Sequence, residues 1–243
     1  MRRIRIFSTA DGLARTLALD LARAVRARPD IVLGLPTGRT PVPLYHRLVA
    51  LHRAGRLDLS RTTTFNLDEF VGITVDDPRS YHAFMRRHFF GHVNLSPRRI
   101  HVLDGSARDL ARECHRFERA IARAGGIDVQ ILGLGANGHI GFNEPARALV
   151  AATHRTRLRE SSRRANRALF GRLGAVPHEA LSMGVGTILH ARRVVIIATG
   201  ATKSRCVARM VRGPVTPSLP ASFLQLHQGT EVWLDRAAAA RLR

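Results

Sequence analysis

Two adjacent acids follow a β-rich run and carry the first candidate chemistry of the sequence. Asp68 and Glu69 lie in FNLDEF, at residues 65–70, where a predicted strand ends. A carboxylate in a partly dry pocket has a raised pKa and can act as a general base. Because successive side chains of a strand point to opposite faces, we expect the two acids to diverge. One would face a cleft, and the other would meet the surface or a helix terminus.

A glycine-rich segment carries the second candidate chemistry. LGLGANGHIGFNEP, at residues 132–145, places four glycines within nine positions and surrounds His139 with Asn137 and Glu144. An imidazole held by a carboxylate is the usual arrangement of a positioned acid–base histidine. The segment contains the GxGxxG pattern, but no helix with an acidic partner is predicted after it, which argues against a dinucleotide site.

Two strand-to-helix turns have the character of anion sites. The segment 34–45, GLPTGRTPVPLY, predicts a turn whose last residue caps a helix that starts at Pro41. Free amides at a helix start favour an anion, and Gly38 lets the backbone approach it. The residues expected to contact that anion are Thr37, Gly38, Arg39 and Thr40.

The second turn, ATGATKSR at residues 198–205, contains Lys203, the only lysine among 39 basic residues. A lysine in the first turn of a helix opposes the helix dipole, and a bound anion between them would remove that conflict. Lysine is a compact charge with three rotatable donors, which suits a confined anion site. The two turns together fit a single phosphate group.

Apolar runs and helical patterns alternate through the chain and would position these residues. The predicted strands are residues 30–35, 61–67, 128–134, 192–200 and 230–235, and the predicted helices are residues 41–55, 80–90, 107–126 and 202–213. This alternation predicts an α/β fold with a doubly wound, mostly parallel, Rossmann-like sheet and helices on both faces. We expect one domain over residues 1–243, with the candidate residues at the carboxyl ends of the strands.

Composition excludes several classes of protein. No stretch of 18 apolar residues and no signal-peptide pattern is present, so we expect a cytoplasmic protein without a membrane span. Cys114 and Cys206 lack metal-site spacing and are expected to be reduced. The net charge of +21 invites a nucleic-acid partner. However, the arginines are scattered rather than clustered and no nucleic-acid-binding motif accompanies them, so nucleic-acid binding is not favoured.

Taken together, the segments resemble the glucosamine-6-phosphate deaminase family, also called glucosamine-6-phosphate isomerase. The resemblance covers nearly the whole chain and is carried by GLPTGRTP, TTFNLDEFVG, SYHAFMRRHFF, LGLGANGHIGFNEP, ALSMGVGTIL, GATKSR and SFLQLH. It implies deamination and isomerisation of glucosamine 6-phosphate to fructose 6-phosphate and ammonia. It implies no cofactor and no metal, a small-molecule amino sugar phosphate as the partner, and either a monomer or a homo-oligomer.

The resemblance also implies a role for each candidate residue. Asp68 would take the proton from C2 and return it at C1. His139 would assist opening of the sugar ring, with Glu144 orienting it and Asn137 nearby. Lys203 and the turn at residues 37–40 would hold the 6-phosphate.

Three positions depart from the family pattern. Asn137 stands where many members have Asp, which would leave the histidine pKa less elevated, and Arg39 stands where a small residue is common. The family's lid arginine is expected at Ala168, whereas this chain has Arg167 one position earlier, about 100° away around a helix. We therefore expect a lid around residues 146–176 with Arg167 as its candidate phosphate ligand.

Four alternatives remain open from sequence alone. The substrate could be galactosamine 6-phosphate or another aminohexose phosphate. The chain could be a hydrolase similar to the 6-phosphogluconolactonases, or a non-catalytic sugar-phosphate sensor, although a sensor needs no base. Nucleic-acid binding through the positive surface is the fourth.

Overall fold

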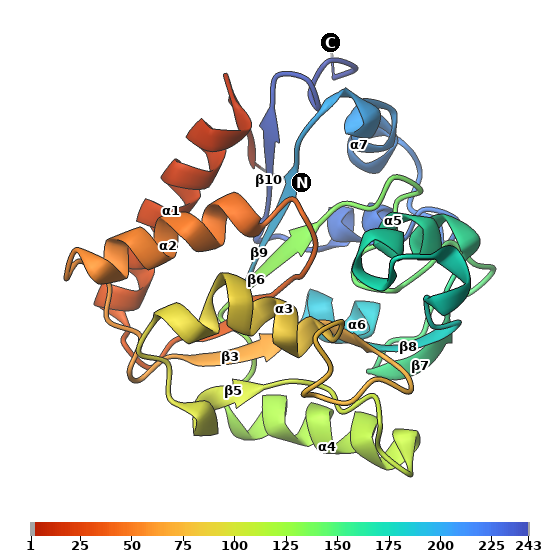
Figure 1. The fold of residues 1–243 in the computed structure, drawn as a ribbon. Coiled ribbons are helices and arrows are strands. Elements are labelled where there is room, and N and C mark those ends of the chain that lie inside the picture. Colours follow the sequence, from red (N-terminus) through yellow and green to blue (C-terminus); the bar gives the residue numbers. More distant parts are fainter. Residues whose placement is uncertain (1–2, 243) are drawn as a thin grey trace.

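A seven-stranded parallel sheet forms the centre of the molecule in a computed structural model that describes residues 3–242. Its strands, in spatial order, are β1 (Arg3–Phe7), β10 (Thr230–Asp235), β9 (Arg193–Ala198), β6 (Val129–Gly133), β2 (Val32–Leu35), β3 (Thr63–Asn66) and β5 (Ile100–His101). All neighbouring strands run parallel (Figure 1). The doubly wound α/β prediction is therefore confirmed.

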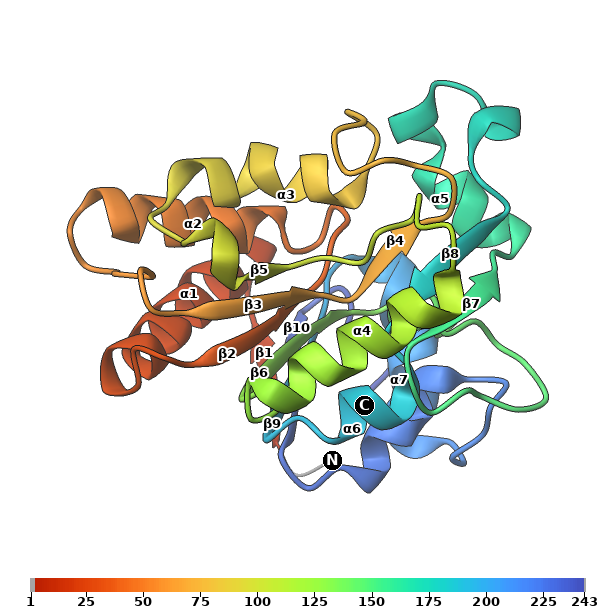
Figure 2. The same cartoon turned by 90° about the horizontal axis from the view of Figure 1, so that it is seen from below.

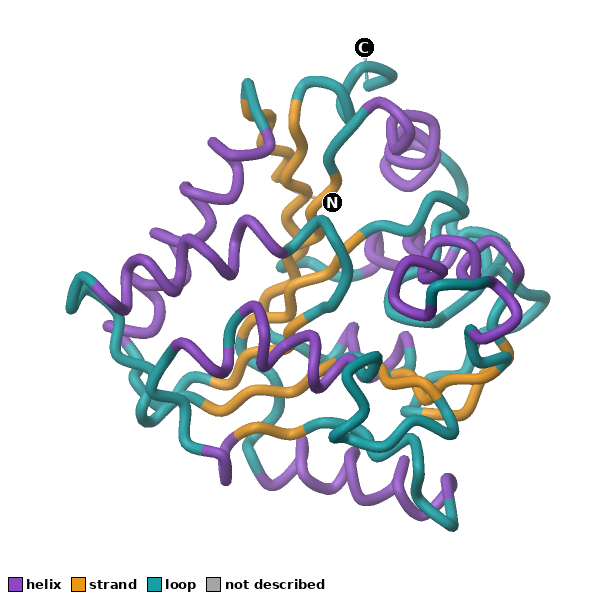
Figure 3. Tube along the Cα trace, viewed as in Figure 1, coloured by secondary structure: helices purple, strands orange, loops and turns teal. Residues whose placement is uncertain are grey.

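Helices cover both faces of this sheet (Figures 2 and 3). On one face lie α1 (Ala10–Ala27), α2 (Val42–Arg53) and α3 (Tyr81–His88), and on the other lie α4 (Leu110–Arg123), α6 (Val185–Leu189) and α7 (Ser204–Arg212). Short 3₁₀ turns complete the order at Phe90–His92, Pro97–Arg99, Leu173–Ala175, Ala201–Lys203 and Pro220–Leu226. No helix within residues 3–242 is both long and apolar enough to cross a membrane.

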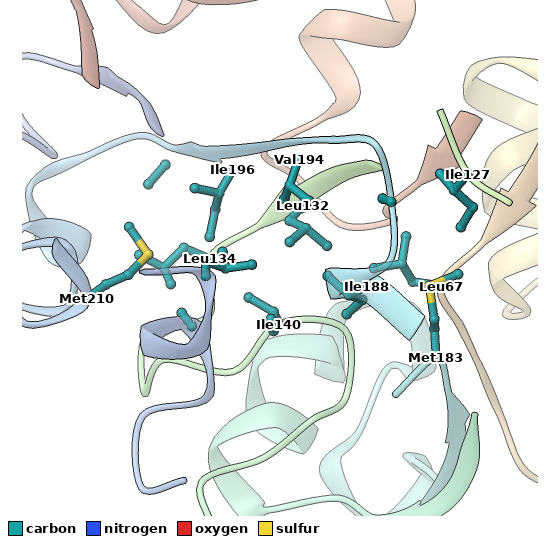
Figure 4. Close-up of a cluster of buried hydrophobic side chains, with 14 of the residues drawn as sticks. Leu67, Ile127, Leu132, Leu134, Ile140, Met183, Ile188, Val194, Ile196 and Met210 are labelled. Carbon is teal, nitrogen blue, oxygen red and sulfur yellow. The ribbon is translucent and has the colours of Figure 1, made fainter. Parts of the chain in front are cut away.

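The alternating side chains of the central strands explain why these strands are apolar throughout. On β6, Ile131 packs with the layer of α1 and α2, whereas Leu132 packs with the layer of α4 and α7. Figure 4 shows Leu132 beside Val194 and Ile196 in the second layer. Because a parallel sheet is buried on both faces, its strands form continuous apolar runs that are recognisable in the sequence.

A second, smaller sheet was not predicted. It is antiparallel and contains β4 (Asp68–Phe70), β8 (Glu179–Ser182) and β7 (His154–Arg157), in that order. Helix α5 (Glu160–Phe170) follows β7, and both lie on the right of Figure 1. Phe70, Tyr81, Phe142 and Phe170 pack together between this sheet and its neighbours. The predicted strand at 61–67 therefore ends at Asn66, and after one residue the chain enters the second sheet.

The start of α2 differs from the prediction. Pro41 occupies the capping position in a helical conformation, and no side chain caps the helix, so the expected cap by Thr40 is wrong. Side-chain caps occur at other helices, where Ser80 accepts a hydrogen bond from the amide of Ala83 and Asp109 from that of Arg112. The amides at the start of α2 are therefore not occupied by a capping side chain.

Candidate functional site

A cavity of about 1010 Å³ opens where the loops after four neighbouring strands meet. The strands are β9, β6, β2 and β3, which lie side by side in the sheet. The chain order reverses between β2 and β6, because β3 and β5 lie on one side of this pair and β9 and β10 on the other. Open α/β sheets bind ligands at such a reversal, outside the carboxyl ends of the strands.

The cavity brings together nearly all candidate residues that the sequence singled out. Those that line it are Thr37, Gly38, Arg39, Thr40, Asp68, Asn137, His139, Arg167 and Lys203. The remaining candidate, Glu144, is buried and contacts Asn137 and His139. Residues separated by up to 166 positions in the sequence, from Thr37 to Lys203, thus share one surface.

Asp68 is a buried acid whose side chain lines the cavity. Its Oδ1 atom is buried and has no hydrogen-bond partner among the described residues. Burial, together with the charge of Glu69, raises the pKa of Asp68 to about 8, against an opposing hydrogen bond from Thr37. An acid of this kind accepts a proton readily once it is ionised.

Glu69, the adjacent acid, has a structural environment. Its carboxylate accepts hydrogen bonds from the amides of Phe70, Tyr81 and His82, at 2.9, 3.0 and 3.1 Å. The last two amides belong to the first turn of α3, where a carboxylate satisfies free donors. Burial raises the pKa of Glu69 to about 7, and these hydrogen bonds oppose the rise. The expectation that one acid faces a cleft and the other meets a helix terminus is confirmed.

His139 lies over the backbone of Gly135 and beside Glu144. A Cβ atom at Gly135 would come within 2.5 Å of the imidazole ring, so only glycine leaves room for the ring. The Nδ1 atom lies 3.7 Å from Oε2 of Glu144. Burial lowers the pKa of His139, Glu144 acts in the opposite direction and Lys203 acts with burial. Burial therefore favours the neutral form of the imidazole.

Asn137 connects the histidine loop to Glu144. Its amide donates to Oε2 of Glu144 at 2.9 Å, and its Oδ1 atom accepts from the backbone amide of His139 at 3.1 Å. An aspartate could not donate in this way. The uncharged residue at this position therefore binds the carboxylate directly.

Cations gather around the same cavity. Lys203 follows Gly200, whose φ of +87° suits glycine and whose amide donates to the Asp235 carboxylate at 3.0 Å. Burial lowers the pKa of Lys203, Cys206 acts in the opposite direction, and the nearby charge of Arg39 acts with burial. Two like charges within electrostatic reach of each other favour an anion between them.

Helix α5 contributes several side chains to the cavity, of which only Arg167 was expected from the sequence. Arg164 and Arg167 both line the cavity from α5, as does Ala168, so Arg167 is not directed away from it. Ser161 and Ser162 line it too. Tyr81 also lines the cavity and donates from its hydroxyl to Asn166 at 2.8 Å. Tyr81 belongs to the SYHAFMRRHFF segment of the resemblance, whereas no quoted motif contained Asn166.

No group of three or more histidine, cysteine or acidic side chains within residues 3–242 is placed to hold a metal ion. The cavity is lined instead by one buried carboxylate, one imidazole and several cations. These groups are suited to binding an anion and to moving protons.

Sequence comparison identifies the family. Residues 7–233 match the model of the family described as glucosamine-6-phosphate isomerases/6-phosphogluconolactonase. The chain belongs to this family. A member from Halothermothrix orenii named glucosamine-6-phosphate deaminase is 44% identical over 230 residues, which cover 95% of each chain. A deaminase of the same name from a Thermoanaerobacter species is 40% identical over 94% of this chain and 90% of its own.

Comparison with solved structures agrees. A solved structure described as a monomeric glucosamine-6-phosphate deaminase has a TM-score of 0.95 and 39% identity, covering 98% of this chain and 99% of its own. The 6-phosphogluconolactonase of Thermotoga maritima has a TM-score of 0.74 at 18% identity, covering 96% of this chain and 97% of its own, so it shares the fold.

Proposed function

We propose that this chain is a glucosamine-6-phosphate deaminase, which converts glucosamine 6-phosphate and water to fructose 6-phosphate and ammonia. Relatives of that name are similar over nearly the full length. The observation that carries the proposal is a buried carboxyl, Asp68, with a hydrogen-bond-free oxygen in the same cavity as His139 and Lys203. This combination supports an isomerising proton transfer on an anchored anion.

The 6-phosphate would bind at the positive part of the cavity. Lys203 and Arg39 supply charge, and the turn at residues 37–40 supplies amides next to the uncapped start of α2. Anchoring the phosphate aligns the far end of the sugar with the acid–base groups, so remote binding energy is used for orientation. Arg167, and Arg164 beside it, add charge from the proposed lid at residues 146–176.

Ring opening is the first chemical step. His139 takes the proton of the C1 hydroxyl and returns a proton to the ring oxygen O5 as the C1–O5 bond breaks, which yields the open-chain aldehyde. A neutral imidazole is needed for the first transfer, and burial favours this form by lowering the pKa of His139. Glu144 then stabilises the imidazolium that forms.

Isomerisation follows at C1 and C2. Ionised Asp68 removes the C2 proton, the electron pair moves into an enolamine, and the proton returns at C1. The resulting imine at C2 adds water and loses ammonia, which leaves the ketose phosphate. Each step exchanges protons among the substrate, Asp68, His139 and water.

We propose that residues 1–243 form a single domain that contains the whole catalytic site.

An ammonia-release assay tests the proposal and separates the alternatives. We expect ammonia and fructose 6-phosphate from glucosamine 6-phosphate, with slower or no release from galactosamine 6-phosphate and no acceleration of 6-phosphogluconolactone hydrolysis. Faster turnover of the galactosamine epimer would reassign the substrate. Hydrolysis of the lactone without ammonia release would assign the chain to the lactonases, and phosphate-sugar binding without any turnover would assign it to the sensors.

A further inference from the structure

The serine Ser162 on α5 lies closer to the imidazole of His139 than the carboxylate of Glu144 does. The hydroxyl of Ser162 lies 3.3 Å from Nδ1 of His139, whereas Oε2 of Glu144 lies at 3.7 Å. Ser162 is 1% exposed, although most of α5 is exposed or half-buried. We propose that Ser162 is a positioning residue for His139, through which the placement of α5 controls the orientation and proton state of the imidazole. This inference rests on the proposed function.

The imidazole ring is held from two directions. The backbone of Gly135 supports its plane, and Ser162 and Glu144 both lie beside Nδ1. Within residues 3–242, Nε2 of His139 has no hydrogen-bond partner in the protein. Because Nδ1 is engaged, Nε2 is the nitrogen that remains available to a sugar hydroxyl.

The hydroxyl of Ser162 suits both proton states of the ring. A neutral imidazole carries one N–H, and a hydroxyl can donate or accept, whereas an ionised Glu144 only accepts. With the proton on Nδ1, the Ser162 hydroxyl accepts it, Glu144 acts through its charge at 3.7 Å, and Nε2 is a base. After Nε2 takes a proton from the sugar, Nδ1–H still donates to the Ser162 hydroxyl, and the charge of Glu144 stabilises the imidazolium. Glu144 and Lys203 are the charged groups whose fields act on this ring, with opposite sign.

Two further contacts link α5 to the same site. Ser161 lies 3.3 Å from the Asn137 amide, and Asn166 accepts from the hydroxyl of Tyr81 at 2.8 Å. A displacement of α5 would therefore break the contacts of Ser161, Ser162 and Asn166 together. The imidazole would be fully oriented only while α5 lies over the cavity, so closure of this segment would complete the acid–base site.

Ser162→Ala and Ser162→Thr test the inference by kinetics. Alanine is the better helix former, so the first variant keeps α5 intact while it removes the hydroxyl. Loss of one hydrogen bond to the reacting group corresponds to a kcat reduced about tenfold on glucosamine 6-phosphate. In Ser162→Ala we expect KM to change less than about twofold, which is small against the tenfold loss of kcat. In Ser162→Thr we expect most of kcat to be recovered. A thermal melt checks that each variant is folded.

Nitrogen-15 NMR of His139 supplies a readout that needs no turnover. In Ser162→Ala we expect the Nδ1 signal to move and the imidazole to titrate at lower pH than in the wild type, since an acceptor for the imidazolium is lost. Glu160→Ala is the control on the same helix, because this side chain is exposed and does not line the cavity, and its His139 ring signals should stay at their wild-type positions.

The outcomes separate the two proposals. Wild-type kcat in Ser162→Ala together with unmoved ring signals would overturn the role of Ser162 while leaving the deaminase intact. A reduced kcat with unmoved ring signals, or one that Ser162→Thr fails to recover in a folded protein, would also overturn it. A wild-type protein without ammonia release would overturn the proposed function, and the ring signals would still decide whether Ser162 sets the state of His139.

Discussion

Replacing Asp68 with Asn should stabilise the protein at alkaline pH while it abolishes turnover. Burial raises the pKa of Asp68 from an ordinary 3.8 to about 8. A carboxyl with a raised pKa in the folded state contributes stability that is fully present below pH 3.8 and is lost as the pH rises to about 8. The ionised acid is thus a cost to folding that an uncharged amide does not impose.

The magnitude follows from the titration. Between pH 5 and pH 8 the unfolded chain has already released this proton and the folded chain mostly has not, so each pH unit costs about 1.4 kcal/mol. Over three units the wild type loses about 4 kcal/mol relative to Asp68→Asn. For a chain of this length that corresponds to a difference in Tm that grows by about 10 °C.

Differential scanning calorimetry at several pH values measures this difference. Glu69, whose pKa is also raised by burial, titrates in both proteins and largely cancels. Asp76→Asn, at an exposed acid, is the matched control and should show no growing difference. A Tm difference between wild type and Asp68→Asn that stays constant from pH 5 to pH 8 would refute a high pKa at Asp68.

Three further changes test other parts of the site. Lys203→Ala should raise KM for glucosamine 6-phosphate at least about tenfold, the effect of one lost charge-assisted hydrogen bond, with a smaller change in kcat. The control Arg205→Ala, on the exposed side of α7, should leave KM unchanged. Equal effects of the two substitutions on KM would remove Lys203 from the phosphate site. Glu144→Gln should lower the pKa of His139 further, because the carboxylate's attraction is lost, and an unchanged imidazole titration by NMR would contradict the pairing. Glu69→Ala should lower the free energy of unfolding by about 2–3 kcal/mol, since the backbone amides of Phe70, Tyr81 and His82 lose their acceptor. A denaturant titration that coincides with that of the wild type would show that these amides find other partners.

The central sheet was predictable because its strands are long enough and apolar enough to be recognised. The run at 128–134 corresponds to β6 (Val129–Gly133), and the predicted 230–235 coincides with β10. The second sheet was not predictable on this basis. Its strand β7 is HRTR, whose side chains are half-buried or exposed, so it shows no apolar pattern, and β4 has only three residues.

The site was only partly predictable for a similar reason. Asp68 and His139 are recognisable because each follows a strand in an unusual local sequence. Ser162 contacts His139 across 23 positions from the first turn of a polar helix, and nothing local distinguishes it from Ser161. The predicted cap by Thr40 is wrong because the neighbouring Pro41 occupies the capping position. Which of the two residues does so depends on the path of the chain from β2. Contacts set by the tertiary fold have no local signal.

The most direct test of the account is the fate of the C2 hydrogen of glucosamine 6-phosphate. Proton NMR in D2O would follow this hydrogen with wild type and with Asp68→Asn, while the phosphorus signal reports binding. We expect wild type to remove it as ammonia forms, and Asp68→Asn to bind the substrate and leave the hydrogen in place. Removal at the wild-type rate without the Asp68 carboxyl would contradict the account.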